Sequence, residues 1–273
     1  MNLDQLIDNA LAEDLRGGSD VTSVATIAEN ANSSAEFVAR NEGVVAGIAV
    51  AVAVLKRVGL TEIVALVKDG DRVHKSQALI SVTGNTRKIL LAERTALNFL
   101  THLSGIATIT SIWVKELAGS NCKVRDTRKT TPGLRDLEKA AVAFGGGTNH
   151  RLGLSDAILI KDNHIQAAGG ITSAINKVKQ LGLEIEVEVD NLDQLKEAIP
   201  LRPDLVLLDN FEPVDCIKAV ALVNGAFKLE ASGGIKLENA KKYAETGVDY
   251  LAIGALTHSA PAFDIGLDFK EEK

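Results

Sequence analysis

The chain has 273 residues and a formal net charge of −6, with 46% hydrophobic but only 4% aromatic residues. This length can bury a substantial core, in one large domain or in two ordinary ones. The acidic balance argues against a nucleic-acid surface, and no apolar stretch reaches membrane-spanning length. The first residues form an amphipathic acidic segment and not a signal peptide, so we expect a cytoplasmic protein with no membrane or nucleic-acid partner.

The first part of the chain is typical of an α+β layer. Alternating apolar residues predict strands over 34–40, 62–67 and 79–82, after an amphipathic helix over 3–15. A long helix is predicted from Thr86, a candidate N-cap, to about residue 103, and the helical pattern continues beyond Gly105 to residue 117. The tail over 263–269 alternates again, which predicts a strand that returns to this layer.

The second part repeats short apolar runs separated by segments with helical spacing, which indicates βαβ units and a parallel sheet. The predicted strands cover residues 122–126, 156–161, 184–189, 204–209, 227–231 and 250–254. The predicted helices between them cover residues 171–181, 192–199, 213–223 and 237–246. The two cysteines, Cys122 and Cys216, lie far apart in apolar contexts, which is typical of buried free thiols.

Six such units are fewer than the eight of a complete barrel, so the pattern favours an α/β protein with an incomplete parallel (β/α) barrel. A doubly wound sheet is the alternative, but no Gly-x-Gly-x-x-Gly motif follows a first strand. The predicted domains are an N-terminal α+β sandwich over 1–110, joined by the tail 262–273, and a barrel over 111–261.

Cations gather around the glycine-rich turn at residues 145–147. Arg128 and Lys129 follow the predicted strand at 122–126, and Lys161 ends the predicted strand at 156–161. Cations at strand ends are where α/β enzymes place ligand-binding groups. A solvated charged face is the ordinary alternative. The strand-end positions favour a pocket for small anions, built from Arg128, Lys129, His150, Arg151 and Lys161.

Small residues follow the last two predicted strands. In (β/α) barrels these loops commonly bind phosphate, because glycine lets backbone N–H groups approach an anion closely. The alternative is that the glycines only turn the chain. We favour a phosphate site formed by Ser232, Gly233, Gly234, Gly254 and Ala255.

Carboxylates occupy the middle strands of the predicted barrel. Alternation puts Glu186 and Glu188 on one face of their strand, and Asp209 ends the next strand. We interpret Glu186 as a surface or salt-bridged residue. Glu188 and Asp209 are better placed to hold ribose hydroxyls, directly or through Mg²⁺.

Two long motifs, DTRKTTPGLR and NHRLGLSDAILIKDNH, resemble the signature of the quinolinate phosphoribosyltransferase family. Shorter segments in the family's order extend the resemblance over nearly the whole chain, from EDLRGGSDVTS to LAIGALTHSAP. The resemblance implies an α/β sandwich domain plus an incomplete barrel. It also implies phosphoribosyl transfer from phosphoribosyl pyrophosphate to quinolinate with decarboxylation, a step of NAD biosynthesis. Arg125 stands where the family more often has a small or apolar residue.

The resemblance also implies roles for individual residues. Arg128, His150 and Arg151 would line the quinolinate site, and Lys129 and Lys161 would face the pyrophosphate and ribose. Glu188 and Asp209 would contact the phosphoribosyl group, with Mg²⁺ held mainly through the substrate. Arg94, an ordinary surface arginine by its local sequence, would reach into the partner subunit's pocket and so implies a homodimer with shared active sites, which could assemble further.

Two other interpretations remain open. A Schiff-base lyase on the same barrel would use Lys161 as its nucleophile. A non-catalytic binding protein, or the molybdenum-locus relative of the family, would keep the fold with another ligand. The remaining charged residues are interpreted as structural: Glu138 and Lys139 on the polar face of a short helix over 134–142, and His164 as a capping residue.

Overall fold

The computed structural model describes residues 2–270, which form two compact units. Unit 1 comprises residues 1–109, 131–146 and 259–273, and unit 2 comprises residues 110–130 and 147–258. The predicted division differs from this one, because it assigned residues 131–146 and 259–261 to the barrel. A local sequence pattern gives the helix at 135–144, but it does not indicate which core that helix joins.

Unit 1 contains a four-stranded antiparallel sheet in the order β12-β1-β5-β3. The strands are β1 (Asn32–Ala39), β3 (Glu62–Ala65), β5 (Ala78–Asn85) and β12 (Ile265–Phe269). The tail strand β12 pairs with β1 along Ala35–Ala39, which confirms the prediction that the C-terminal segment returns to this layer. A short antiparallel pair, β2 (Gly43–Val44) with β4 (Arg72–Val73), completes the β structure of the unit.

Five helices belong to unit 1 wholly or in part: α1 (Leu3–Leu15), α2 (Val21–Thr26), α3 (Ile48–Arg57), α4 (Thr86–Glu116) and α5 (Arg135–Phe144). The helix α4 begins at Thr86, which was predicted to be its N-cap. The capping residue is Asn85 instead, because its side chain accepts the backbone N–H of Lys88 at 3.2 Å. The helix continues through Gly105, where an added Cβ would lie 2.2 Å from the carbonyl oxygen of Pro261. Glycine therefore permits the tail to pass against the helix.

By length and composition alone, α4 could cross a membrane, which differs from the expectation that no apolar stretch is so long. In the structure 56% of its apolar window is buried within the protein, as is usual for the core helix of a folded domain.

Unit 2 is built on a six-stranded parallel sheet in the order β6-β11-β10-β9-β8-β7. The strands are β6 (Lys123–Arg125), β7 (Ile158–Ile160), β8 (Ile185–Val189), β9 (Leu205–Asp209), β10 (Lys228–Ser232) and β11 (Tyr250–Ala252). Every predicted strand is present, and β6 and β7 are the open edges. This is the six-stranded incomplete barrel that the repeats predict.

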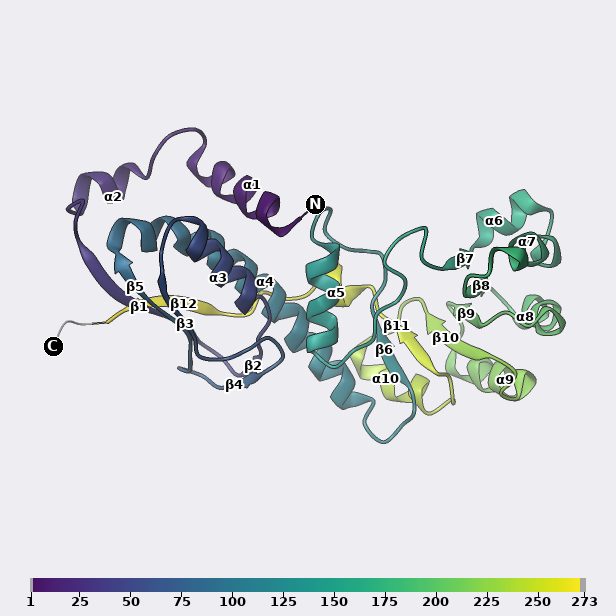
Figure 1. Cartoon of the computed structure of the whole chain (residues 1–273). Coiled ribbons are helices and arrows are strands. Elements are labelled where there is room, and N and C mark those ends of the chain that lie inside the picture. The colour runs from purple at the N-terminus through teal and green to yellow at the C-terminus, as the bar shows by residue number, and fades with distance from the viewer. Residues whose placement is uncertain (1, 271–273) are drawn as a thin grey trace. The chain divides into compact units, whose positions relative to one another are not determined.

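In unit 2, β7 is followed by two helices and each of β8, β9, β10 and β11 by one α-helix (Figure 1). They are α6 (Asp162–Ala168), α7 (Ile171–Val178), α8 (Leu192–Ala198), α9 (Pro213–Val223), α10 (Leu237–Ala244) and the short α11 (Ala255–His258). Val187, Val189, Val206 and Leu208 are fully buried in the sheet, as expected of parallel strands covered by helices. Because side chains alternate, Glu186 and Glu188 lie on the other face of β8.

Candidate functional site at the carboxyl ends of the parallel strands

A pocket of about 300 Å³ lies in unit 2. Its lining combines residues from the carboxyl ends of the strands with the loop that follows β6 and the loop that precedes β7. The lining residues are Thr127, Arg128, Lys129, His150, Arg151, Leu159, Lys161, Glu188, Leu207, Asp209, Glu230, Ser232 and Ala252. Eight of the thirteen predicted site residues therefore meet in one cavity, although they come from six separate parts of the sequence.

The starts of the two long motifs, DTRKTTPGLR and NHRLGLSDAILIKDNH, lie side by side at the edge strand β6. Thr148 forms a parallel bridge with Arg125, in which the Thr148 N–H donates to the carbonyl of Val124 at 2.9 Å. The buried carboxylate of Asp126 then accepts the backbone N–H of His150 at 2.8 Å and the side-chain amide of Asn149 at 2.5 Å. Asp126 thus fixes the second motif beside the first, which explains why cations more than 20 residues apart share a wall.

Two guanidinium groups, those of Arg128 and Arg151, are held close together in this wall. Burial and then the charge of Arg128 lower the pKa of Arg151, while the carboxylates of Glu186 and Asp156 act in the opposite direction. The Nε atoms of both arginines are buried and have no hydrogen-bond partner. Arg151 makes one hydrogen bond from Nη1, to the carbonyl of Ala157 at 3.1 Å. Like charges with unmet donors at a cavity indicate a site for an anion.

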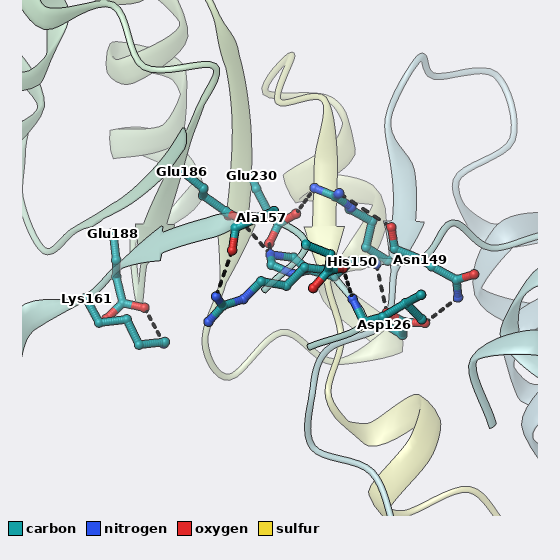
Figure 2. Close-up of polar contacts among 12 residues, drawn as sticks. Asp126, Asn149, His150, Ala157, Lys161, Glu186, Glu188 and Glu230 are labelled. Atoms are coloured by element: carbon teal, nitrogen blue, oxygen red, sulfur yellow. Dashed lines mark hydrogen bonds and ion pairs between the residues drawn. The ribbon is translucent and has the colours of Figure 1, made fainter. Parts of the chain in front are cut away.

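His150 is buried, with 8% of its surface exposed, and both of its ring nitrogens contact protein groups. The Nε2 atom lies 2.7 Å from Oε2 of Glu186, and Nδ1 accepts the backbone N–H of Arg151 at 2.8 Å. Figure 2 shows the ring pointing toward the carboxylates of Glu186 and Glu230. The structure therefore places His150 in the pocket wall as predicted, but it also shows how the ring holds the backbone at Arg151.

Glu186 is 5% exposed and its Oε2 contacts Nε2 of His150 at 2.7 Å, so of the two alternatives given by the sequence the structure excludes the surface residue and agrees with the ion-paired one. Glu230, which sequence reasoning missed, is fully buried and pairs with Arg125, whose Nη1 lies 2.9 Å from Oε2. Burial and then the Glu186 charge raise the pKa of Glu230 to about 7, against the opposing effects of Arg125 and His150. Side-chain alternation along β10 could have indicated the burial of Glu230, because it places Glu230 on the inner face of the sheet, as it places Glu186 and Glu188 in β8.

Lys161 and Glu188 form the polar end of the pocket nearest the edge strand β7. The Lys161 ammonium lies 2.7 Å from Oε2 of Glu188, whose side chain is only 10% exposed. Asp209, at the end of the neighbouring strand β9, accepts the Asn210 amide at 2.7 Å. His164 accepts the backbone N–H of Lys161 at 3.0 Å at the start of α6, which confirms its predicted capping role.

The small-residue loops lie at the ends of the adjacent strands β10 and β11. Gly233 and Gly234 have φ values of +96° and +61°, so they do form a turn that favours glycine. An added Cβ on Gly254 would lie 3.0 Å from the Lys129 side chain, and Thr257 donates to the Lys129 carbonyl at 2.8 Å. Ser232 lines the pocket itself, whereas Gly233, Gly234 and Gly254 lie in the loops beside it and Ala255 begins α11.

Arg94 lies in unit 1 on α4, is exposed, and forms no ion pair within residues 2–270. It is not part of the pocket in unit 2.

Unit 1 contains a larger cavity, of about 500 Å³, between α1, α4 and the start of α5. Its wall includes His102, whose Nε2 contacts Glu138 at 2.8 Å. Glu138 and Lys139 are buried, and not on a solvated helix face as interpreted from the sequence. Burial acts to raise the pKa of Glu138, but hydrogen bonds from His102 and Thr131 have the larger combined effect, so its pKa is below the ordinary value. Acids predominate in this cavity, so it lacks the convergent cations of the pocket in unit 2.

Comparisons with known proteins agree along the whole length of the chain. Residues 106–268 match the family model described as quinolinate phosphoribosyl transferase, C-terminal domain, and residues 20–104 match the model of its N-terminal domain. The nicotinate-nucleotide pyrophosphorylase [carboxylating] of Mycobacterium leprae is 48% identical over 270 residues, covering 96% of this chain and 95% of the relative.

Solved structures give the same result. The nicotinate-nucleotide pyrophosphorylase of Ehrlichia chaffeensis superposes with a TM-score of 0.94 at 40% identity, over 99% of both chains. The enzyme of the same name from Francisella tularensis also superposes with a TM-score of 0.94, at 41% identity, over 99% of this chain and 98% of that one.

Proposed function

Because the chain belongs to the quinolinate phosphoribosyltransferase family, we propose that the pocket in unit 2 is where it transfers phosphoribose from phosphoribosyl pyrophosphate to quinolinate. The enzyme is a pentosyltransferase that yields nicotinate mononucleotide, carbon dioxide and pyrophosphate, a step of NAD biosynthesis. The observation that carries the assignment of the site is the pair of guanidinium groups of Arg128 and Arg151, with buried, unpartnered Nε atoms at the cavity.

Quinolinate is a planar pyridine with two adjacent carboxylates, and the arginine pair provides planar donors for them. Arginine binds carboxylate in a bidentate manner, whereas lysine acts as a point charge. His150 forms the wall behind Arg151 and holds its backbone, and Asp126 holds the backbone of His150. In this arrangement the ring nitrogen of the substrate would face the polar end of the pocket, where Lys161 and Glu188 lie.

The phosphoribosyl pyrophosphate would occupy the polar end of the pocket. Its 5-phosphate would bind at Ser232, Gly233, Gly234, Gly254 and Ala255, where small residues would let backbone N–H groups approach an anion closely. Glu188 and Asp209 end two adjacent strands and would accept hydrogen bonds from the ribose hydroxyls. Lys129 lies above Gly254 and would face the pyrophosphate.

The donor set at this end also fits Mg²⁺ that is held mainly through the substrate. Glu188 already pairs with Lys161, and Asp209 accepts from Asn210, so each carboxylate has only part of its capacity left for a cation. Mg²⁺ normally binds one or two carboxylates together with substrate phosphates and water. When bound, it would neutralise the charge that develops on the departing pyrophosphate.

Each charge that would develop during the reaction has a residue of opposite charge in the site. The bond between the ribose C1 atom and pyrophosphate breaks, and the cationic ribose is stabilised by Glu188 and Asp209. Lys129 and Lys161 stabilise the pyrophosphate, and the ring nitrogen forms the new bond to C1. The alkylated, positively charged nitrogen then stabilises the carbanion left when the bond between C2 and its carboxylate breaks, and that carbon takes up a proton.

The pairing of Lys161 weakens the Schiff-base alternative. A nucleophilic amine must present a free lone pair to the carbonyl carbon, whereas Nζ of Lys161 donates to the Glu188 carboxylate at 2.7 Å. Borohydride trapping with a carbonyl substrate would modify Lys161 if the alternative were right.

We also propose that the enzyme is a cytoplasmic homodimer in which Arg94 enters the partner's pocket. The exposure of Arg94 and its lack of an ion pair within residues 2–270 support this role, because an arginine that belongs to a neighbouring site has no reason to be neutralised in its own chain.

A single assay tests the proposed function: phosphoribosyl-pyrophosphate-dependent release of carbon dioxide from quinolinate labelled in its 2-carboxylate. Substitution Arg151→Lys keeps the charge but removes the planar donor pair, and is expected to raise KM for quinolinate by at least about tenfold. An unchanged KM would contradict the assignment of the dicarboxylate to this arginine pair.

A further inference from the structure

Asn210 follows the strand β9 directly and has a backbone conformation that few residues other than glycine adopt. Its φ is +55°, in the left-handed region, and the residue is exposed. Asparagine tolerates this region because its short polar side chain can form local hydrogen bonds. The proposed reaction gives Asn210 no role, although it contacts two groups that the reaction uses: the Asp209 carboxylate and the turn at Ser232 and Gly233.

The side chain of Asn210 holds one oxygen of the Asp209 carboxylate. Its Nδ2 donates to Oδ2 of Asp209 at 2.7 Å. A carboxylate only accepts hydrogen bonds, so the NH₂ end of the amide faces Asp209 and the amide oxygen points elsewhere. Asp209 lines the pocket, and with Oδ2 held by the amide, Oδ1 is the oxygen left for a ribose hydroxyl. An acceptor that is already oriented loses less conformational freedom when the ligand binds.

The other end of the same amide lies against the glycine turn that follows β10. A Cβ added to Gly233 would lie 2.7 Å from Cγ of Asn210, which is too close for a side chain. The φ of Gly233 is +96°, so glycine is favoured there for its backbone conformation as well. The backbone N–H of Asn210 also donates to the Ser232 carbonyl at 2.8 Å and continues the pairing of β9 with β10. Asn210 therefore contacts the ends of both strands.

From these contacts we infer that Asn210 is a positioning residue for the phosphoribosyl group. It holds the Asp209 carboxylate and the turn at Ser232 and Gly233 in a fixed relation, so that the ribose and the 5-phosphate of one substrate bind to both at the same time. The inference rests on the proposed function, which places the ribose at Asp209 and the phosphate at that turn. The contacts of Asn210 do not involve the arginine pair, so the affinity for quinolinate should not depend on it.

The chemistry of the side chain determines which variants are informative. Glycine permits the left-handed backbone but has no side chain, so Asn210→Gly removes the amide without straining the turn. Aspartate also tolerates this conformation, but Asn210→Asp removes the donor and places a second carboxylate beside Asp209. Both variants should therefore release the Asp209 carboxylate, and the second is available if the first does not fold.

The test is calorimetry of the full chain with phosphoribosyl pyrophosphate, in the presence of Mg²⁺ and phthalate. Phthalate has the two adjacent carboxylates of quinolinate but no ring nitrogen, so the complex forms without reaction. Asn210→Gly should weaken the binding of phosphoribosyl pyrophosphate roughly tenfold, the lower end for a hydrogen bond to a charged group, because this pair is exposed. The affinity for quinolinate alone should not change. In steady-state kinetics KM should likewise rise for phosphoribosyl pyrophosphate and not for quinolinate.

A double-mutant cycle shows whether Asn210 acts through Asp209. In the presence of Asp209→Ala the amide has no carboxylate to hold, so Asn210→Gly should then weaken the binding of phosphoribosyl pyrophosphate by only about twofold or less, within the usual additivity error. A general loss of stability would instead affect both substrates, and its effect would be the same with and without the Asp209 carboxylate.

The matched control is Asn224→Gly. Asn224 is also exposed and left-handed, with a φ of +46°, but it caps the far end of α9 and does not line the pocket, so both affinities should stay unchanged. An unchanged affinity of Asn210→Gly for phosphoribosyl pyrophosphate would overturn the inference and leave the proposed function intact. An equal loss for both substrates, or a tenfold loss that persists with Asp209→Ala, would also overturn it. If the unmodified enzyme did not bind phosphoribosyl pyrophosphate beside phthalate, the proposed function itself would be contradicted.

Discussion

The Lys161 ammonium and the Glu188 carboxylate lie 2.7 Å apart at the ends of the neighbouring strands β7 and β8. Glu188 is nearly buried, whereas the side chain of Lys161 is 46% exposed. The lysine thus compensates the carboxylate while its other N–H groups remain available to the pocket. When phosphoribosyl pyrophosphate binds, Lys161 would contact its pyrophosphate and Glu188 would stabilise the positive charge that develops on its ribose.

Substitution Lys161→Ala should therefore lower kcat more than it raises KM for either substrate. The ammonium acts on negative charge that develops as pyrophosphate leaves, so its largest contribution is to the transition state. We expect a loss in kcat on the order of 10²-fold or more, as for other groups that stabilise developing charge. Steady-state kinetics with both substrates varied measures it, and Lys196→Ala, which removes an exposed lysine paired with Asp193, is the control. A raised KM with an unchanged kcat would show that Lys161 only binds.

Nicotinate should be a very poor substrate in place of quinolinate. It lacks the second carboxylate, so part of the donor set of Arg128 and Arg151 would remain buried and unpaired, as their Nε atoms already are. Sites built around such donors reject the analogue that lacks the acceptor by roughly 10³- to 10⁵-fold. The comparison of kcat/KM for the two acids measures this ratio. Similar values would contradict a dicarboxylate pocket.

Much of this site follows from the sequence because strand ends and loop glycines are local features. Alternation in β8 places Glu188 inside the sheet, and the repeat of βαβ units brings Lys161, Glu188 and Asp209 to the same edge of it. The position of β12 is also predictable. Its alternating apolar residues are typical of a strand, and a strand at the end of the chain must pair with the edge of an existing sheet.

The unpredicted parts depend on contacts between distant segments. Glu186 shares the alternation of Glu188, but its burial depends on His150, which is brought to it by Asp126. The raised pKa of Glu230 depends on three other strands or loops. The helix α3 was not assigned, because its Ile, Ala and Val residues alternate with period two and fit a strand as well as a helix.

The stability of the enzyme should fall with pH in a way that depends on Glu230. Its pKa in the folded protein, about 7, is above the ordinary value of 4.5, so the folded state binds more protons than the unfolded state between these values. The contribution of this group is fully present below pH 4.5 and is lost as the pH rises through about 7. The free energy of unfolding of the unmodified enzyme, relative to Glu230→Gln, should therefore decrease by roughly 1–3 kcal/mol between pH 5 and pH 8.

Urea unfolding of both proteins at several pH values measures this difference. Loss of the Arg125 partner lowers the stability of the variant at every pH, so the slope with pH, and not the offset, is the informative quantity. A difference that stays constant from pH 5 to pH 8 would show that Glu230 does not titrate in this range.

Chelation of divalent cations should abolish turnover without unfolding the protein. The carboxylates near the proposed pyrophosphate site are each partly engaged, so we expect Mg²⁺ to bind tightly only with phosphoribosyl pyrophosphate. Activity should be lost in EDTA and restored by added Mg²⁺, while the melting temperature without substrate should not change. Full activity in EDTA, or strong Mg²⁺ binding to the free enzyme, would contradict a cation that is held through the substrate.

Arg94 tests whether active sites are shared between subunits. If it enters the partner's pocket, Arg94→Ala and Lys161→Ala should each be nearly inactive as homodimers. In a mixed dimer with a two-fold axis, one pocket collects both substitutions and the other is intact. Random reassortment of the two inactive variants should then restore up to about one quarter of the unmodified activity. Lys88→Ala, which removes another exposed cation from α4, should remain active by itself and provides the control. An active Arg94→Ala would mean that the arginine is an ordinary surface cation. An inactive Arg94→Ala that does not recover on mixing would mean that it acts within its own subunit.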